Sequence, residues 1–294
     1  MLKHEFADVN GVRLHYARAG EGKLILFVHG FPEFWYAWKN LLPEFGRDHL
    51  AVAPDMRGYN LSSKPADVTD YAVPHLVDDL RALAKSLGHE KFILVAHDWG
   101  GGVAWSLAIH HPECLEKLVI INAPHPAPFE RELARNPAQQ AASQYMLLFR
   151  SPKAEATLAA DNYAFLVDAV LTRGLKKGHF NEDDRQAYLA AWSQPGALTG
   201  SLNWYRAAKI GPPGGPDAQA RSFEPSGGPS KVSVPTLVIW GEKDQALVKE
   251  NLDGLDQYVP DLTVRRIADG THWVIHERPA EVTAHIREFL ARPR

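Results

Sequence analysis

The segment Ala96-His97-Asp98-Trp99-Gly100-Gly101 decides the fold class of this 294-residue chain. It follows an apolar run and precedes a helical pattern that ends before Pro112. Small residues two positions before and two positions after Asp98 permit the strained strand-to-helix turn that presents one side chain, as in the G-x-S-x-G pattern of serine enzymes. Here the presented side chain is a carboxylate. Asp98 is therefore a candidate nucleophile, and the alternative is that it only caps the following helix.

Apolar runs that end in polar residues or Gly recur along the chain and predict buried parallel strands. They cover residues 24–28, 50–53, 92–96, 118–121, 235–240 and 262–267. Helical patterns lie between strands, notably from Val73 to Leu87 and from Gly101 to His110. This alternation indicates an α/β fold with a mostly parallel sheet covered by helices. The Asn10-Gly11 pair predicts an antiparallel hairpin near the start.

The alternation of strands and helices stops between about His125 and Val232, where the spacing is helical and predicts no strand. We therefore expect residues 1–124 and 233–294 to form the sheet domain and residues 125–232 to form an inserted helical cap. The segment at about 211–229 contains Gly-Pro-Pro-Gly-Gly-Pro, which is too broken for a regular element. It is expected to be the return linker of the cap.

Composition excludes several classes of partner. Lys and Arg number 32 against 35 Asp and Glu, and no dense basic cluster is present, so neither a nucleic acid nor an anionic membrane is expected to bind. The single cysteine, Cys114, cannot form an internal disulfide, and no zinc-site spacing is present, so no metal or cofactor is expected. Acidic residues near the N-terminus and the lack of long apolar stretches predict a cytoplasmic protein, either monomer or homodimer.

Two later strands are followed by candidate partners for Asp98. Asp244 comes in Trp240-Gly241-Glu242-Lys243-Asp244, and His272 comes in Asp269-Gly270-Thr271-His272-Trp273. A single His or Asp after a strand is usually structural. The order nucleophile, acid, histidine, with each member after a strand, is the order used on the α/β-hydrolase fold. The sequence therefore predicts a triad of Asp98, Asp244 and His272.

The first parallel strand is followed by His29-Gly30-Phe31-Pro32-Glu33. At this place the α/β-hydrolase fold supplies one amide of the oxyanion hole, and the residue after the nucleophile supplies the other. We assign the hole to the backbone N–H groups of Phe31 and Trp99. The turn formed by Gly30 and Pro32 would aim the first of them.

Together, the runs His29 to Tyr36, Asp55-Met56-Arg57-Gly58-Tyr59 and His97 to Gly101, with Asp244 and His272-Trp273, resemble the soluble epoxide hydrolases over nearly the whole chain. The resemblance implies two cap tyrosines that hold the epoxide oxygen, and Tyr145 and Tyr205 match their contexts. Asn60 stands where that family commonly has Gly, and Asn best tolerates a left-handed backbone. Arg150-Ser151-Pro152 replaces the more usual Gln-Glu-Pro, which bears on local cap geometry.

The resemblance implies hydrolysis of an epoxide to a vicinal diol. Asp98 would attack the ring while Tyr145 and Tyr205 donate hydrogen bonds to the departing oxygen. His272, oriented by Asp244, would then activate water against the resulting ester. Glu33 and His97 are candidates for supporting contacts near these groups. The aromatic side chains of Phe31, Trp35 and Trp99 predict a small apolar epoxide as the substrate.

Three alternatives stay open to different degrees. Haloalkane dehalogenases commonly have Asn in place of Phe31 and haloacetate dehalogenases have Arg in place of Trp99, and neither requires paired cap tyrosines. A ligand-binding protein without catalytic activity could use the same scaffold, because a fold does not fix a function. A serine-type esterase is the weakest alternative, because Asp98 occupies the nucleophile position.

Overall fold

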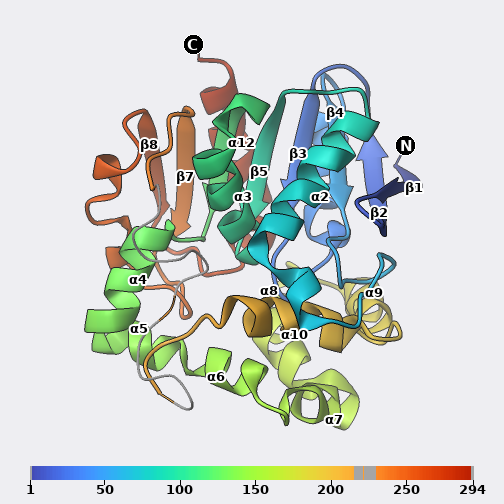
Figure 1. Ribbon diagram of the computed structural model, residues 1–294, viewed down its shortest axis with the longest axis vertical. Coiled ribbons are helices and arrows are strands. Elements are labelled where there is room, and N and C mark those ends of the chain that lie inside the picture. Colours follow the sequence, from blue (N-terminus) through green and yellow to red (C-terminus); the bar gives the residue numbers. More distant parts are fainter. Residues whose placement is uncertain (1, 215–220, 222–229, 293–294) are drawn as a thin grey trace.

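A mixed, mostly parallel sheet forms the centre of the computed structural model, which describes residues 2–214, 221 and 230–292 (Figure 1). The sheet has eight strands in the order β1-β2-β4-β3-β5-β6-β7-β8. β2 pairs antiparallel with β1 and β4, and the other neighbours pair parallel. The strands are β1 (Lys3–Val9), β2 (Val12–Ala19), β3 (Leu24–Val28), β4 (Leu50–Pro54), β5 (Phe92–His97), β6 (Leu115–Ile121), β7 (Thr236–Gly241) and β8 (Leu262–Ile267).

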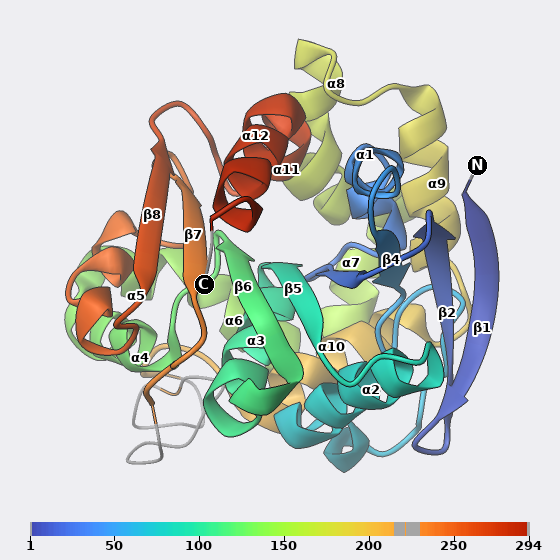
Figure 2. The same ribbon diagram turned by 90° about the horizontal axis from the view of Figure 1, so that it is seen from above.

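Helices cover both faces of the sheet, and its central strands are therefore buried on both sides. Leu26 and Val28 of β3 pack into one apolar cluster, whereas Ile25 and Phe27 pack into another, as the two-residue period of a strand requires. Figure 2 shows α2 and α3 on one face and α1, α11 and α12 on the other. These helices are α1 (Leu41–Phe45), α2 (Val73–Ser86), α3 (Trp99–His110), α11 (Val274–Glu277) and α12 (Pro279–Leu290).

The predicted α/β class and sheet are confirmed, with small differences at the ends of elements. The hairpin turn has φ angles of 47° at Asn10 and 76° at Gly11, the left-handed pair that a tight hairpin needs. α3 begins at Trp99, two residues before the predicted start, because the elbow leads directly into the helix. Among the described residues, no helix is both long and apolar enough to cross a membrane. The cytoplasmic location stays a prediction.

An inserted helical region, which we call the cap, connects β6 to β7. These two strands are neighbours in the sheet, with Leu118 opposite Thr236, so the cap is one excursion from the sheet. The cap helices gather at one end of the sheet (Figure 1). The expected domain boundaries stay predictions, and most of the return linker at about 211–229 lies outside the described residues. The cap helices are α4 (Pro126–Arg135), α5 (Pro137–Ala142), α6 (Gln144–Arg150), α7 (Ala154–Leu166), α8 (Arg173–Lys177), α9 (Glu182–Trp192) and α10 (Ala197–Ala208).

Candidate active site

Asp98 occupies a sharp turn between β5 and α3. Its backbone has φ 51° and ψ −125°, a conformation that costs a non-glycine residue energy and that is typical of functional sites. The helix starts close against β3, since a Cβ atom at Gly100 would collide with the carbonyl oxygens of Val28 and His29. A small residue two positions after Asp98 is therefore a packing requirement. The turn directs the Asp98 carboxylate away from the sheet.

The two oxygens of the Asp98 carboxylate have different surroundings. The backbone N–H of Phe31 donates a hydrogen bond of 2.7 Å to Oδ1. His272 Nε2 lies 3.4 Å from Oδ2. Burial raises the pKa of Asp98, but His272, His97 and the backbone N–H of Trp99 more than offset this effect, so the pKa lies below its ordinary value. Asp98 is therefore ionised at neutral pH, with the two predicted oxyanion amides, those of Phe31 and Trp99, both donating to its carboxylate.

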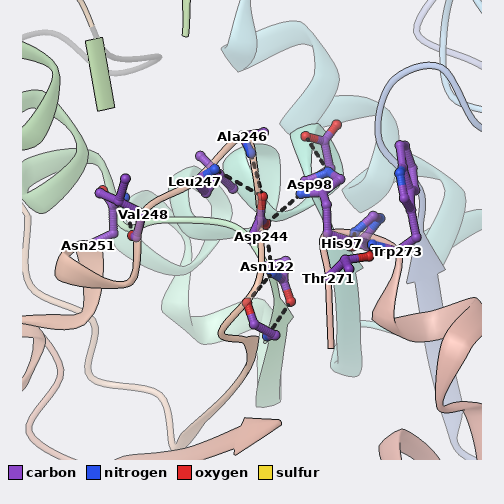
Figure 3. Close-up of polar contacts among 12 residues, drawn as sticks. His97, Asp98, Asn122, Asp244, Ala246, Leu247, Val248, Asn251, Thr271 and Trp273 are labelled. Atoms are coloured by element: carbon purple, nitrogen blue, oxygen red, sulfur yellow. Dashed lines mark hydrogen bonds and ion pairs between the residues drawn. The ribbon is translucent and has the colours of Figure 1, made fainter. Parts of the chain in front are cut away.

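His272 lies between two carboxylates. Its Nδ1 is 2.7 Å from Asp244 Oδ2, while its Nε2 faces Asp98. Asp244 Oδ1 accepts hydrogen bonds from the backbone N–H groups of Ala246, at 2.7 Å, and Leu247, at 3.0 Å (Figure 3). Burial lowers the pKa of His272, but Asp244 and Asp98 together raise it well above the ordinary value. The structure thus brings together the three residues that the sequence predicted as a triad.

Asn122 completes the surroundings of Asp244 and was missed as a functional residue in the sequence. It follows β6 directly with φ 41°, and its Nδ2 donates a hydrogen bond of 2.7 Å to Asp244 Oδ2. Its Oδ1 accepts a hydrogen bond of 2.9 Å from the backbone N–H of Gly241, at the end of β7. Asn122 therefore fixes the carboxylate against the neighbouring strand. The available signal was an Asn at the carboxyl end of a strand, a position that favours both functional side chains and left-handed backbone.

A cavity of about 270 Å³ lies over Asp98 and His272. Tyr145 of α6 and Tyr205 of α10 line it from the cap, as the resemblance implied. Their ring centres are 6.3 Å apart. The other lining residues are mostly apolar and comprise Phe31, Pro32, Ala142, Phe149, Phe165, Leu166, Ala169, Gln245, Ala246 and Trp273.

Both cap tyrosines stay protonated at neutral pH. Burial raises the pKa of each phenol well above its ordinary value, and the negative charge of Asp98 raises it further. Aromatic rings fix the side chain of Tyr205, with the Trp99 and Phe149 ring centres each 5.2 Å away. The phenols are therefore neutral hydrogen-bond donors in the wall of the cavity that Asp98 also lines.

Glu33 and His97 lie beneath the triad and do not line this cavity. His97 Nε2 is 2.8 Å from the carbonyl oxygen of His272, and His97 Nδ1 is 3.3 Å from Glu33 Oε2. Glu33 Oε1 lies 2.6 Å from both the Tyr188 hydroxyl of α9 and His276 Nε2 of α11. Tyr188 and His276 were missed in the sequence, because neither follows a strand. This buried cluster ties the cap, the first loop and the segment that carries His272 to one another.

The expected position of Trp35 beside the substrate is corrected by the structure. Trp35 is absent from the cavity lining among the described residues. Its ring packs edge-on against His4 of β1, with ring centres 4.7 Å apart. Its backbone N–H donates to Asp55 Oδ1 at 2.9 Å, and its side chain lies at the antiparallel edge of the sheet.

Asn60 is left-handed, with φ 39°, as expected for an Asn in place of Gly. Its Nδ2 donates a hydrogen bond of 2.8 Å to the buried carboxylate of Asp55. The departure from the family pattern therefore preserves the backbone conformation and adds a polar contact.

Comparison with known proteins identifies the family of this chain. A family model described as "alpha/beta hydrolase fold" matches residues 23–279. AB hydrolase superfamily protein YfhM of Bacillus subtilis (strain 168) is 39% identical over 293 residues, which cover 98% of this chain and 98% of that protein. Epoxide hydrolase 2 of Caenorhabditis elegans is 34% identical, and the match covers 98% of this chain and 79% of that protein.

A solved structure is similar over nearly the whole chain. The crystal structure of Bacillus megaterium epoxide hydrolase in complex with an inhibitor has a TM-score of 0.92 and 40% sequence identity, and the match covers 98% of this chain and 100% of that one. These matches confirm the resemblance found in the sequence. The chain belongs to the α/β-hydrolase fold family and, within it, to the epoxide hydrolases.

Proposed function

We propose that this protein converts an epoxide and water to a vicinal diol through a covalent ester on Asp98. One observation carries the proposal: Asp98 lines a cavity that Tyr145 and Tyr205 of the cap line as well. A carboxylate is a serviceable nucleophile toward the strained carbon of an epoxide and needs no base to activate it. The phenols supply the donors that the departing oxygen requires.

In the first step, Asp98 Oδ2 attacks one ring carbon and the C–O bond of the epoxide breaks. Oδ2 is the attacking atom because Oδ1 already accepts a hydrogen bond from Phe31. Negative charge develops on the epoxide oxygen, and one of the two tyrosines gives it a proton as the bond breaks. The product is a hydroxyalkyl ester of Asp98, with Oδ1 as its carbonyl oxygen.

In the second step, His272 removes a proton from water, and the hydroxide attacks the ester carbonyl carbon. Esterification removes the negative charge of Asp98, which is one of the groups that raise the pKa of His272. The imidazole therefore becomes a base when the ester forms. The amides of Phe31 and Trp99 stabilise the oxyanion, and loss of one such donor typically costs about 3–4 kcal/mol in activation free energy. Collapse of the tetrahedral intermediate breaks the ester C–O bond, and the His272 imidazolium gives its proton to the departing oxygen, which completes the diol. The remaining proton of the attacking water leaves the Asp98 carboxyl group through solvent and restores the tyrosine that was ionised in the first step.

Glu33 and His97 act in this proposal as positioning residues. His97 contacts the backbone carbonyl of His272 and therefore helps to fix the segment that carries the base. Burial raises the pKa of Glu33, but His276 and His97 more than offset this effect and hold the pKa well below its ordinary value. Glu33 is thus a buried carboxylate that orients both rings. Neither residue touches the substrate cavity.

The apolar cavity lining supports a small apolar epoxide as the substrate, with water as the second reactant. A mutant of the Bacillus megaterium enzyme has been solved with its product, (R)-3-[1]naphthyloxy-propane-1,2-diol. An aromatic epoxide with a short linker is therefore a suitable first substrate. The expected state, a monomer or a homodimer, stays a prediction.

A dehalogenase would use the same nucleophile, acid and base. Phe31 and Trp99 occupy the positions that carry Asn or Arg in haloalkane and haloacetate dehalogenases, so the expected groups for halide or carboxylate are missing at these two positions. The paired cap phenols favour a leaving group that takes up a proton, which is the epoxide oxygen. We therefore expect diol formation without halide release.

Trapping the ester tests the proposal. The variant His272→Gln, incubated with styrene oxide, should gain the mass of one substrate molecule on Asp98, because ester formation does not require the base. The control Asp98→Ala should gain no mass and produce no diol. A second variant, Tyr145→Phe with Tyr205→Phe, should form the ester at least a hundredfold more slowly, since both donors are lost. An unmodified His272→Gln protein that retains the fold and binds substrate would refute the two-step mechanism.

A further inference from the structure

Gln139 of α5 is a fully buried glutamine to which the mechanism above gives no role. Its Nε2 donates hydrogen bonds of 2.8 Å to the hydroxyl oxygen of Ser143 and of 2.8 Å to the carbonyl oxygen of Ala246. Its Oε1 accepts hydrogen bonds of 3.0 Å from the backbone N–H of Val248 and of 2.9 Å from Asn251 Nδ2. A carboxamide has two donors and two acceptor positions, and all four are used here. The side chain is therefore held in one orientation between the cap and a loop of the sheet.

Two of these four contacts are made with the backbone of the loop that carries the triad acid. Asp244 Oδ1 accepts hydrogen bonds from two N–H groups of this loop, one of which belongs to Ala246. Gln139 binds the carbonyl oxygen of Ala246 and the N–H of Val248, so it holds the same stretch of backbone from the side of the cap. Asp244 is connected to the nucleophile through His272. The loop that Gln139 contacts is therefore fixed relative to the nucleophile.

Another of the four contacts lies at the start of the helix that carries Tyr145. Ser143 is the single residue between α5 and α6, and its side chain is fully buried. Its carbonyl oxygen accepts a hydrogen bond of 3.0 Å from the N–H of Met146, in the first turn of α6. Tyr145 follows two residues after Ser143 and lines the substrate cavity. The hydrogen bond between Gln139 and Ser143 therefore fixes the beginning of α6 against the loop of the triad acid.

We propose that Gln139 is a positioning residue for ring opening, which sets the place of the Tyr145 hydroxyl relative to the Asp98 carboxylate. The inference rests on the proposed epoxide hydrolysis, in which Tyr145 donates to the departing oxygen while Asp98 attacks the ring. Both groups must meet neighbouring atoms of one small ring, and a displacement of about 1 Å can lower a rate by roughly a hundredfold. Gln139 is not among the described residues that line the cavity, so it acts through Tyr145 and does not touch the substrate.

The variant Gln139→Met tests the inference, because Met has a similar length and cannot form the four hydrogen bonds. Single turnovers with styrene oxide give the rate constants of ester formation and ester hydrolysis separately. We expect the rate constant of ester formation to fall by about ten- to a hundredfold. Ester hydrolysis should be affected much less, because Asp244 keeps its contacts with Asn122 and with the N–H groups of its own loop. Equal slowing of the two steps would overturn the inference.

The two tyrosine variants identify the group through which Gln139 acts. In Tyr145→Phe the hydroxyl is already absent, so adding Gln139→Met should lower the rate constant of ester formation by no more than about twofold, the usual error of such a cycle. In Tyr205→Phe, where Tyr145 is the remaining donor, the loss should stay at least about tenfold. A loss of the same size in both backgrounds would show that Gln139 acts on the fold at large and would overturn the inference.

Gln140→Met is the matched control. Gln140 is the next residue of α5, and its Nε2 donates to two carbonyl oxygens of α4, within the cap. Both rate constants of this variant should equal those of wild type. Ser143→Ala is a milder change that removes the hydrogen bond to Gln139, and it should slow ester formation by about two- to tenfold, the range of a single neutral hydrogen bond.

The outcomes separate this inference from the proposed function. Wild-type ester formation in a folded Gln139→Met protein would overturn the inference and leave the proposed function intact. If thermal unfolding shows that Gln139→Met does not fold, wild-type ester formation in Ser143→Ala overturns it instead. Absence of both ester and diol with the wild-type protein would overturn the proposed function, and this inference with it.

Discussion

Replacing Asn122 by Gly tests the contacts that hold the triad acid. The change removes the hydrogen bond to Asp244 Oδ2, and it leaves the N–H of Gly241 without its acceptor. A hydrogen bond to a charged group contributes about 1.5–3 kcal/mol, and an unsatisfied buried N–H costs about 1–3 kcal/mol. Gly accepts the local φ of 41° without strain. We therefore expect the free energy of unfolding to fall by about 3 kcal/mol and Tm by roughly 6–12 °C.

The same substitution should change the kinetics in a defined direction. With one donor fewer, the Asp244 carboxylate interacts more strongly with the His272 imidazolium and raises the pKa of His272 further. The base is then neutral only at higher pH. We expect the pH midpoint of the rate constant for ester hydrolysis to move by about one unit toward alkaline pH. A shift of one pKa unit corresponds to a change of about 1.4 kcal/mol in the interaction between Asp244 and the imidazolium. Stopped-flow measurement of ester decay between pH 5 and 10, with styrene oxide as substrate, reports this midpoint.

Two comparisons isolate the cause. Asn122→Ala should be less stable than Asn122→Gly by about a further 1 kcal/mol, since Ala is disfavoured in left-handed backbone. Asn10→Gly makes the same change at another left-handed Asn, in the N-terminal hairpin, and should leave the pH dependence of ester decay unchanged. If Asn122→Gly melts within 1 °C of wild type and its pH profile overlays that of wild type, the reasoning about Asp244 is wrong.

Two more outcomes are expected. The rate constant of ester formation in single turnovers should not change from about pH 5 to 9, because Asp98, with its lowered pKa, is already ionised there. The rate constant of ester hydrolysis should increase as His272 loses its proton. A shared pH midpoint for the two rate constants would contradict the mechanism. Gly100→Ala should lower the free energy of unfolding by about 1–3 kcal/mol and kcat/KM by about a hundredfold, because the added Cβ collides with the carbonyl oxygens of Val28 and His29 and displaces the turn that carries Asp98. Thermal unfolding and steady-state kinetics measure the two effects. An unchanged kcat/KM would show that this turn tolerates the displacement.

The sheet could be predicted from the sequence because its strands are short apolar runs bounded by polar residues and Gly. β8 was predicted to the residue, and β3 likewise, because burial and turn residues mark their ends. β6 begins at Leu115, three residues before its prediction, because Glu116 and Lys117 interrupt the apolar run. The side chain of Lys117 is buried against the last turn of α12, where its Nζ donates to the carbonyl oxygens of Phe289 and Leu290. A local pattern carries no information on such a distant partner.

Part of the candidate site could also be predicted from the sequence, and part could not. The positions of Asp98, Asp244 and His272 after strands predicted that they would meet at one end of the sheet, and they do. The contacts of Glu33 were beyond prediction, since its partners Tyr188 and His276 lie 155 and 243 residues away along the chain. The prediction for Trp35 was wrong because it relied on proximity in the sequence. It is close in sequence to Phe31, yet it lies beyond a turn that directs it to the other edge of the sheet.

The insertion of the cap between two adjacent strands separates the two halves of catalysis. The groups proposed to cleave the ester, namely the triad and the two oxyanion amides, all come from loops that follow strands of the sheet or, for the Trp99 amide, from the first residue of α3. The groups proposed to assist ring opening, Tyr145 and Tyr205, come from α6 and α10 of the cap. Because β6 and β7 pair directly, the sheet can keep its register while the segment between them diverges. Evolution of one excursion could thus exchange the leaving group that the protein accepts and leave the water-consuming step untouched.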